Sequence, residues 1–402
     1  MRLRVSSVAR ACARVVASVA VCLPLLVVDV ANAQDDEDCC VCVDTCLPTW
    51  RARADYLFWW TKGNSVPPLV TTSPDGTSRT MAGVLGTPGV EVLFGDEQID
   101  NELRSGGRLT LSKWLNDGTE FAVEGVFLYL DDDRNTGDFG ATSLGSPILA
   151  RPFLNARTGA EDAELVAFPD VLDGRVDVAS SSEIYSAELL ARWNSRRGPR
   201  GSIDLVGGYR YFHLDESLRI REQLTSLEIG GVVPLGTQFD LSDRFSTNND
   251  FHGGQLGVAA EFWRDFVSLE LSAKFALGNL RRQWHVSGDT AAQIPGLVPT
   301  TAPGGLLALP TNLGTHSDNE FAVLSEFGIT GTMLLTSRLS VVCGYSLLLL
   351  NDVARTGDQI DRTVNTSQIG GRPLDGPPRP ATQLRGSDFW MQGINVGLDY
   401  RW

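Results

Sequence analysis

Apolar and polar residues alternate with a period of two along most of the chain. Between Val267 and Gly278 the large apolar residues occupy the odd-numbered positions, and mostly polar or small residues occupy the even-numbered ones. A strand separates two such sets onto opposite faces, whereas a helix would mix them. The pattern therefore predicts a chain built of β-strands. It recurs within residues 120–129, 185–193, 203–211, 255–262, 320–329 and 338–347.

The length of these tracts separates two all-β classes. They run for about 9–13 residues, whereas a soluble strand averages about 5–6 and a membrane strand needs about 9–11. Their apolar faces often end in an aromatic residue, as in the girdle at a membrane interface. A secreted β-sandwich is the alternative, and it explains the alternation but not these two features. The predicted girdle residues are Trp60, Tyr129, Trp193, Tyr211, Tyr345, Trp390, Tyr400 and Trp402.

The final alternating tract, 390–402, ends the chain on Trp402. This ending resembles the C-terminal signal by which bacterial outer-membrane barrels are recognised for insertion. We therefore expect an all-β, antiparallel, up-and-down transmembrane barrel over residues 51–402, with about 12 strands and 10–14 admissible, because single-chain bacterial barrels have even numbers. Its expected partners are the lipid bilayer and the outer-membrane assembly machinery.

The first alternating tract contains one residue that does not fit. Tyr56, Phe58 and Trp60 share the lipid-facing side, but Trp59 falls on the inner side, one place short of the rim. Three long segments, 131–182, 288–317 and 351–385, carry little periodicity. In a barrel the long connections are the extracellular loops, so we expect these segments to be such loops.

The N-terminus is predicted to be a processing segment. Basic residues precede an apolar run over 15–30, and Ala31-Asn32-Ala33 follows, which predicts a signal peptide over 1–33 cleaved after Ala33 and a location in the bacterial outer membrane. A membrane anchor is the alternative, although Pro24 and Asp29 interrupt the run.

An acidic, cysteine-rich segment, 34–50, comes next and contains Cys39, Cys40, Cys42 and Cys46. The spacing lacks a paired C-x2-C, and no histidine lies nearby, so disulfides are favoured over a metal or thiol cluster. Which cysteines pair stays open.

Charged residues oppose the apolar faces of the strands, and in lipid they must point inward. They either pair as filler or line a wet lumen. The lumen-facing candidates are Arg108, Glu124, Glu188, Arg192, Asp204, Arg210, Glu261, Glu270, Lys274, Glu320 and Glu326. The formal net charge of −15 argues against nucleic acid as a partner.

The sequence lacks the motifs of common catalytic sites. The four histidines are scattered, and there is no G-x-S-x-G, phosphate loop or H-E-x-x-H. We therefore predict no catalytic residue, no cofactor and no metal, and a chain that is not an enzyme. A barrel lipid hydrolase, with a triad assembled from several strands, is the remaining enzymatic alternative.

Five blocks resemble a known family: 54–74, 205–220, 243–279, 339–365 and 387–402. They are similar in order and spacing to the beta-barrel porin type 7 family of planctomycete outer-membrane barrels. The resemblance implies the fold and no established substrate. Our first functional expectation is a passive channel for small hydrophilic solutes. The alternative is a non-conducting surface scaffold or adhesion barrel that displays its loops. The oligomeric state stays open.

Overall fold

The computed structural model describes residues 49–115, 120–131, 138–382 and 384–402. The predicted signal peptide and the four cysteines of the segment 34–50 lie outside the described residues. Among the described residues, no helix has the length and apolar character needed to cross a membrane.

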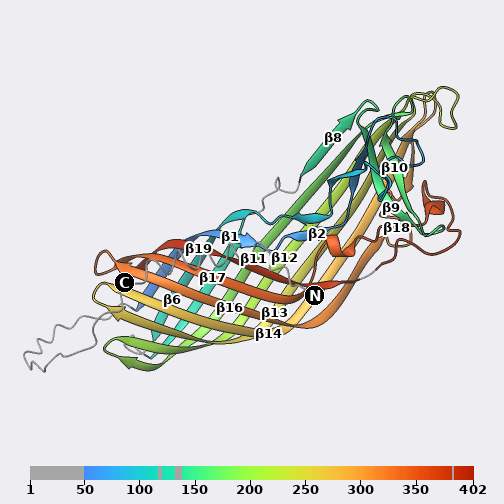
Figure 1. Cartoon of the computed structure of the whole chain (residues 1–402). Coiled ribbons are helices and arrows are strands. Elements are labelled where there is room, and N and C mark those ends of the chain that lie inside the picture. Colours follow the sequence, from blue (N-terminus) through green and yellow to red (C-terminus); the bar gives the residue numbers. More distant parts are fainter. Residues whose placement is uncertain (1–48, 116–119, 132–137, 383) are drawn as a thin grey trace, which may run out of the picture. The chain divides into compact units, whose positions relative to one another are not determined.

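Ten antiparallel strands form a closed ring. Each strand pairs with the next ring strand along the chain, β1 pairs with β19, and β11 pairs with β12, so the ring has no free edge (Figure 1). The number ten lies within the expected range of 10–14 but below its centre of 12. The ring strands are β1 (Trp50–Thr61), β6 (Leu103–Leu115), β7 (Phe121–Leu130), β11 (Leu172–Gly198), β12 (Gly201–Ser226), β13 (Gln238–Arg264), β14 (Val267–Gln293), β16 (Gly314–Leu334), β17 (Leu339–Ala354) and β19 (Gly386–Arg401).

The first and last ring strands join along a continuous register, from Arg51 opposite Arg401 to Thr61 opposite Met391. At the start of this seam Trp50 and Trp402 exchange two backbone hydrogen bonds of 3.0 Å. Their rings stack with centroids 6.1 Å apart. We call the end of the barrel that carries this pair the terminal end, and the opposite end the far end.

Strands β11 to β14 are 26 or 27 residues long, about twice the predicted tracts. The apolar face changes sides along them. On β12, Ile203 and Leu205 are exposed on the outside of the terminal half, whereas Leu218 and Ile220 are buried on the inside of the far half. In the terminal half the strand therefore presents its apolar residues to lipid. In the far half the apolar residues point inward and form an ordinary protein core, with charged residues such as Arg221 outside.

Two of the three predicted loops contain several strands beside irregular chain, which corrects the expectation for them. Segment 131–182 contains β8 (Phe139–Ser143), β9 (Ile148–Asn155), β10 (Glu161–Ala167) and the start of β11. Segment 288–317 contains the end of β14, β15 (Thr300–Pro303) and the start of β16. Segment 351–385 is mostly irregular, with η1 (Gly357–Gln359), β18 (Thr363–Val364) and η2 (Thr366–Gln368) after the end of β17.

A further long connection, between β1 and β6, was not foreseen. It holds β2 (Asn64–Val66), β3 (Val70–Ser73), β4 (Glu91–Phe94) and β5 (Glu97–Ile99). Strands β3, β4, β9, β10 and β18 make a small separate sheet, drawn in Figure 1 at the end away from the C-terminus. Its buried residues, among them Val70, Leu149 and Val166, pack with inward residues of the ring, including Leu218 and Phe245, so the far half of the barrel is filled.

Candidate functional site: the closed interior of the barrel

The terminal half of the barrel interior is occupied by paired charges. Lys274 lies 2.8 Å from Glu188 and 3.3 Å from Glu326, and Arg210 also contacts Glu326. Because buried charges in this setting need opposite charges within reach, the strands that place them inward also satisfy them.

A second group of ion pairs adjoins the first. Arg192 lies 2.9 Å from Asp204, 3.5 Å from Glu124 and 3.8 Å from Glu270. Asp55 lies 2.8 Å from Arg53 and 3.1 Å from Arg108. We call these two groups the charge network. Arg192 and Arg108 both line the same cavity of about 80 Å³, which holds only a few water molecules. The charges thus fill the interior more than they line a wide passage.

The structure places the predicted lumen-facing residues in three settings. Nine of them belong to the charge network: Arg108, Glu124, Glu188, Arg192, Asp204, Arg210, Glu270, Lys274 and Glu326. Glu261 lines the mouth at the terminal end. Glu320 lies closer to the far end, where its side chain is 48% exposed and 3.3 Å from Arg282. The candidates did not include Asp399, which is buried and pairs with Arg51. Both residues occupy inward positions in the alternation of their strands, and this alternation is the sequence pattern that could have identified them.

An apolar layer closes the barrel above the charge network. Every ring strand except β6 contributes at least one inward apolar side chain to it, and β6 contributes Gly106, whose missing side chain leaves room for Leu130. Almost all of these side chains are 0–2% exposed, so no water-sized passage runs between them. The layer consists of Leu57, Trp59, Leu128, Leu130, Ile184, Phe212, Leu214, Phe251, Ala276, Leu280, Ala322, Leu324, Leu348, Leu350, Val353, Phe389 and Met391.

Trp59 belongs to this layer. Its indole N–H donates a hydrogen bond of 2.7 Å to the side-chain oxygen of Asn395, and the side-chain nitrogen of Asn395 donates one of 2.9 Å to the Ser346 hydroxyl. Gly393 lies opposite Trp59 in the register, and a Cβ there would come within 2.6 Å of the indole ring. The glycine therefore allows the ring to lie across the neighbouring strand.

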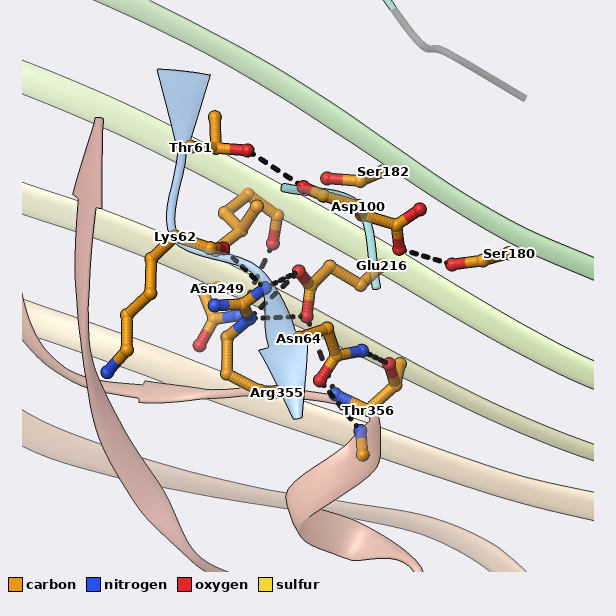
Figure 2. Close-up of polar contacts among 12 residues, drawn as sticks. Thr61, Lys62, Asn64, Asp100, Ser180, Ser182, Glu216, Asn249, Arg355 and Thr356 are labelled. Carbon is orange, nitrogen blue, oxygen red and sulfur yellow. Dashed lines mark hydrogen bonds and ion pairs between the residues drawn. The ribbon is translucent and has the colours of Figure 1, made fainter. Parts of the chain in front are cut away.

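A polar latch holds the connecting segments inside the wall (Figure 2). The Arg355 guanidinium donates to both oxygens of Glu216 at 2.8 Å and to the Lys62 carbonyl at 3.2 Å. Asn249 accepts from the Ala354 N–H at 2.7 Å and donates to the Ala354 carbonyl at 2.9 Å. Glu216 and Asn249 lie on β12 and β13, so two strands of the wall bind the segment that follows β17.

Figure 2 also shows the connection after β1 joined to the same segment. The Asn64 amide donates to the Thr356 hydroxyl, and its oxygen accepts from the Gly357 N–H at 3.1 Å. Thr61 donates to the Asp100 carbonyl at 3.1 Å, and Ser180 donates to the Asp100 carboxylate. We define the latch as Asn64, Glu216, Asn249, Arg355 and Thr356. It joins three distant parts of the chain directly above the apolar layer, since Arg355 lies 5.3 Å from the Phe389 ring.

The far half contains one more buried charge cluster, centred on Arg151. Its guanidinium contacts Glu222 and lies 2.8 Å from Asp243, which also accepts from the Ala308 N–H at 2.8 Å. One oxygen of Glu164 is buried nearby without a hydrogen-bond partner. Burial, and then the charge of Glu222, raise the pKa of Glu164 well above its ordinary value. Three acids share one arginine, so this cluster favours a protonated carboxyl.

The predicted girdle residues form two rims and one exception. Trp193, Tyr400 and Trp402 lie outward at the terminal end, and Trp60, Tyr129, Tyr211 and Trp390 lie near the level where the apolar face changes sides. Tyr345 lies between the rims, opposite Ile329 and Ile394. Its hydroxyl donates to Gln392 at 2.9 Å, which satisfies the polar group within the apolar band.

Among solved structures, the outer membrane protease OmpT from Escherichia coli resembles the chain at 8% identity with a TM-score of 0.39, covering 88% of this chain and 97% of that one. A FadL homologue from Pseudomonas aeruginosa does so at 9% identity and a TM-score of 0.24, covering 88% and 90%. At these values the likeness carries no argument about function. No curated protein matches the chain.

The strongest comparison is at the level of the family. A family model described as Putative beta barrel porin-7 matches residues 50–402, which are the ring together with all of its connections. Each block that suggested this resemblance contains part or all of at least one ring strand, namely β1, β12, β13, β14, β17 or β19. The chain therefore belongs to the Putative beta barrel porin-7 family of β-barrels.

Proposed function

We propose that this outer-membrane barrel does not conduct, and that it holds a rigid platform of connecting segments outside the membrane. The observation that carries the proposal is the apolar layer. An ion or small solute crosses a barrel through water, and a layer of solvent-free side chains that reaches inward from the ring strands interrupts that water. Between our two expectations, the layer favours the scaffold over the passive channel.

The far half supports the second part of the proposal. Strands β11 to β14 continue well beyond the apolar band, with charged residues outside and a buried core inside. The latch then fixes the connections to this wall. A frame that holds its loops by buried hydrogen bonds and ion pairs presents them in one arrangement, which suits recognition of a partner more than passage of a solute.

The passive channel for small hydrophilic solutes keeps one supporting observation, namely the inward charges of the terminal half. Conduction would require the apolar layer to move aside. The deciding experiment is planar-bilayer conductance of the refolded protein. We expect no discrete conductance steps across several voltages, whereas stable steps of reproducible size would overturn the scaffold proposal. Heat-dependent mobility on a denaturing gel verifies that the protein in the assay is folded.

Two further proposals concern export. We infer that the chain is cleaved after Ala33 and that its last strand, β19, is what the outer-membrane assembly machinery recognises. The small-x-small sequence before Gln34 and the alternation that ends on Trp402 support them. Mass spectrometry of the exported protein tests the first, since the mature chain should begin at Gln34.

We also propose that the chain has no enzymatic activity. His213 lies 2.8 Å from Asp250, but the pair is on the outer wall, and Tyr211 donates to the same carboxylate at 2.6 Å. The cavity between the charges of the terminal half lies on the opposite side of that wall. An assay with phospholipid vesicles tests the hydrolase alternative, and release of fatty acid by the refolded protein would revive it.

A further inference from the structure

The mouth at the terminal end contains two adjoining cavities of about 140 and 230 Å³. Arg197, Glu261, Trp263 and Arg401 line both, and we call the space around these four residues the terminal vestibule. The charge network lies behind it, because Arg51 lines both the smaller of these cavities and the cavity between the network's charges. With the apolar layer beyond, the terminal vestibule is a blind pocket that opens only at the terminal end.

Two tryptophans face this pocket from the inner side of the wall. Trp114 and Trp263 follow the inward alternation of β6 and β13, so the lipid girdle does not account for them. The Trp263 indole donates to the Pro199 carbonyl at 2.9 Å. For Trp114, the described residues provide no hydrogen-bond partner for the indole N–H, and its ring lines the smaller cavity. An aromatic surface, and a donor without a partner among the described residues, are what a ligand with apolar and polar parts requires of a pocket.

The charges of the terminal vestibule are also unmatched, in contrast to those of the charge network. Within the described part of the chain, neither the exposed Arg197 nor Glu261 makes a direct ion pair, although the charge of Arg51 acts on Glu261 at longer range. The Arg197 guanidinium instead lies 5.8 Å from the centre of the Trp263 ring. Arg401 is 3.6 Å from Asp399, whose carboxylate already lies 2.5 Å from Arg51. Among the described residues, the pocket therefore offers a guanidinium and a carboxylate that both lack a direct ion pair, beside aromatic rings.

This combination selects a ligand by its charges. A simple anion would leave Glu261 unmatched, and a simple cation would leave Arg197 unmatched, whereas a molecule with both charges satisfies both. We propose that the terminal vestibule binds a small zwitterion, an amino acid or a short peptide with free ends. Its carboxylate pairs with Arg197, whose forked donors suit a carboxylate, its ammonium pairs with Glu261, and its apolar part lies on Trp114 and Trp263. This site is independent of whether the barrel conducts.

Isothermal titration calorimetry on the detergent-refolded full chain tests the proposal, with alanyl-alanine as the probe. The same dipeptide acetylated at its amine or amidated at its carboxylate lacks one of the two charges. We expect each blocked form to bind at least about tenfold more weakly than the free dipeptide. A hydrogen bond to a charged group contributes on the order of 1.4 kcal/mol or more, which corresponds to a factor of ten in affinity. Equal binding of the free and blocked dipeptides, or no binding of the free dipeptide at millimolar concentration, overturns the proposal.

Two substitutions assign the charges. Arg197→Gln should weaken the free dipeptide about tenfold and abolish its advantage over the amidated form, while Glu261→Gln should abolish its advantage over the acetylated form. Arg196→Gln is the matched control, since Arg196 is exposed on the same hairpin and lines neither cavity. Loss of binding in all three variants, with heat-dependent gel mobility retained, would contradict the assignment.

The size of the zwitterion is settled by two more probes, free alanine and tetra-alanine. Tighter binding of alanine identifies a single amino acid as the ligand, and tighter binding of tetra-alanine identifies the end of a peptide. Either result supports the proposal, provided that acetylation or amidation weakens the binding of that probe. None of these measurements depends on conductance, so they stand or fall separately from the scaffold proposal.

Discussion

At the scale of single residues, Trp59 shows how one side chain connects a strand to the centre of the barrel. Its neighbours Phe58 and Trp60 face lipid, whereas its own indole is fully buried and bonded to Asn395. The alternation predicted the inward direction. The partner was not predictable, because Asn395 is 336 positions away and only the register of the closing seam brings it opposite.

Trp59→Phe should lower the free energy of unfolding by about 1–3 kcal/mol, because it removes the donor and leaves the buried Asn395 oxygen unsatisfied. Trp60→Phe is the matched control on the adjacent, lipid-facing position. The expected change there is within about 0.5 kcal/mol, as for other substitutions outside buried networks. Unfolding in urea from detergent micelles, followed by gel mobility, measures both. Similar losses for the two variants would show that the hydrogen bond to Asn395 contributes little.

Glu164 predicts a pH dependence. Its pKa is raised in the folded chain, so the folded state holds the proton more tightly than the unfolded state does. The stability that it contributes is therefore fully present below its unfolded pKa of about 4.3 and is lost as the pH rises through the folded value.

Glu164→Gln keeps a neutral side chain at all pH values, so it should raise the melting temperature at neutral pH and change it little at acid pH. Circular dichroism melts across the pH range measure the effect. Asp162→Asn on the same strand serves as the control, since Asp162 accepts a hydrogen bond from Asn155. A stabilisation by Glu164→Gln that is the same at every pH would contradict the account.

At the scale of elements, the change of the apolar face along β11 to β14 explains where sequence reasoning stopped. The period of two continues through the whole of β12, but its outward residues become polar after Tyr211. A tract defined by an outward apolar face therefore ends there, and the remainder of β12 falls outside both the predicted tracts and the predicted loops. The far half of β12 carries a pattern that could have identified it as a strand. There the inward positions Leu218, Ile220 and Leu224 are apolar and the outward positions Arg219, Arg221 and Gln223 are polar, the reverse of the terminal half.

Cysteine labelling tests this division of β12. In a chain whose native cysteines are replaced by serine, Arg221→Cys should react with a membrane-impermeant maleimide when the protein is in lipid vesicles. Leu205→Cys, outward on the same strand, should be protected until detergent is added. Both side chains point outward, so only the lipid distinguishes them. Equal reactivity in vesicles would place the apolar band elsewhere.

At the scale of the whole molecule, the family, the all-β fold and the closing by the last strand followed from the sequence, and the filled interior did not. Inward charges such as Glu188 and Lys274 suggested either a wet lumen or paired filler, and their pairing depends on ring geometry that no local pattern encodes. The expected range of 10–14 strands includes the ten of the ring, and the small sheet of β3, β4, β9, β10 and β18 lies outside it.

The latch supplies a prediction at this scale. Glu216→Gln leaves the buried Arg355 guanidinium without its carboxylate, and breaking such a pair costs about 3–5 kcal/mol. We expect the segment 351–385 to become sensitive to trypsin while the ring keeps its heat-dependent mobility. Glu228→Gln is the control, because it removes an exposed partner of Arg79 in the far connections. Protection of the segment in both variants would show that the apolar contacts hold it without the latch.

The seam between β1 and β19 has a consequence for how the molecule is made. Until β19 arrives, both β1 and β17 present unpaired backbone groups along a full strand, which lipid does not tolerate. The apolar layer is likewise incomplete, since Phe389 and Met391 belong to β19. A chain without β19 therefore has neither a closed ring of strands nor a complete apolar layer, so the perimeter and the interior are completed by the same strand.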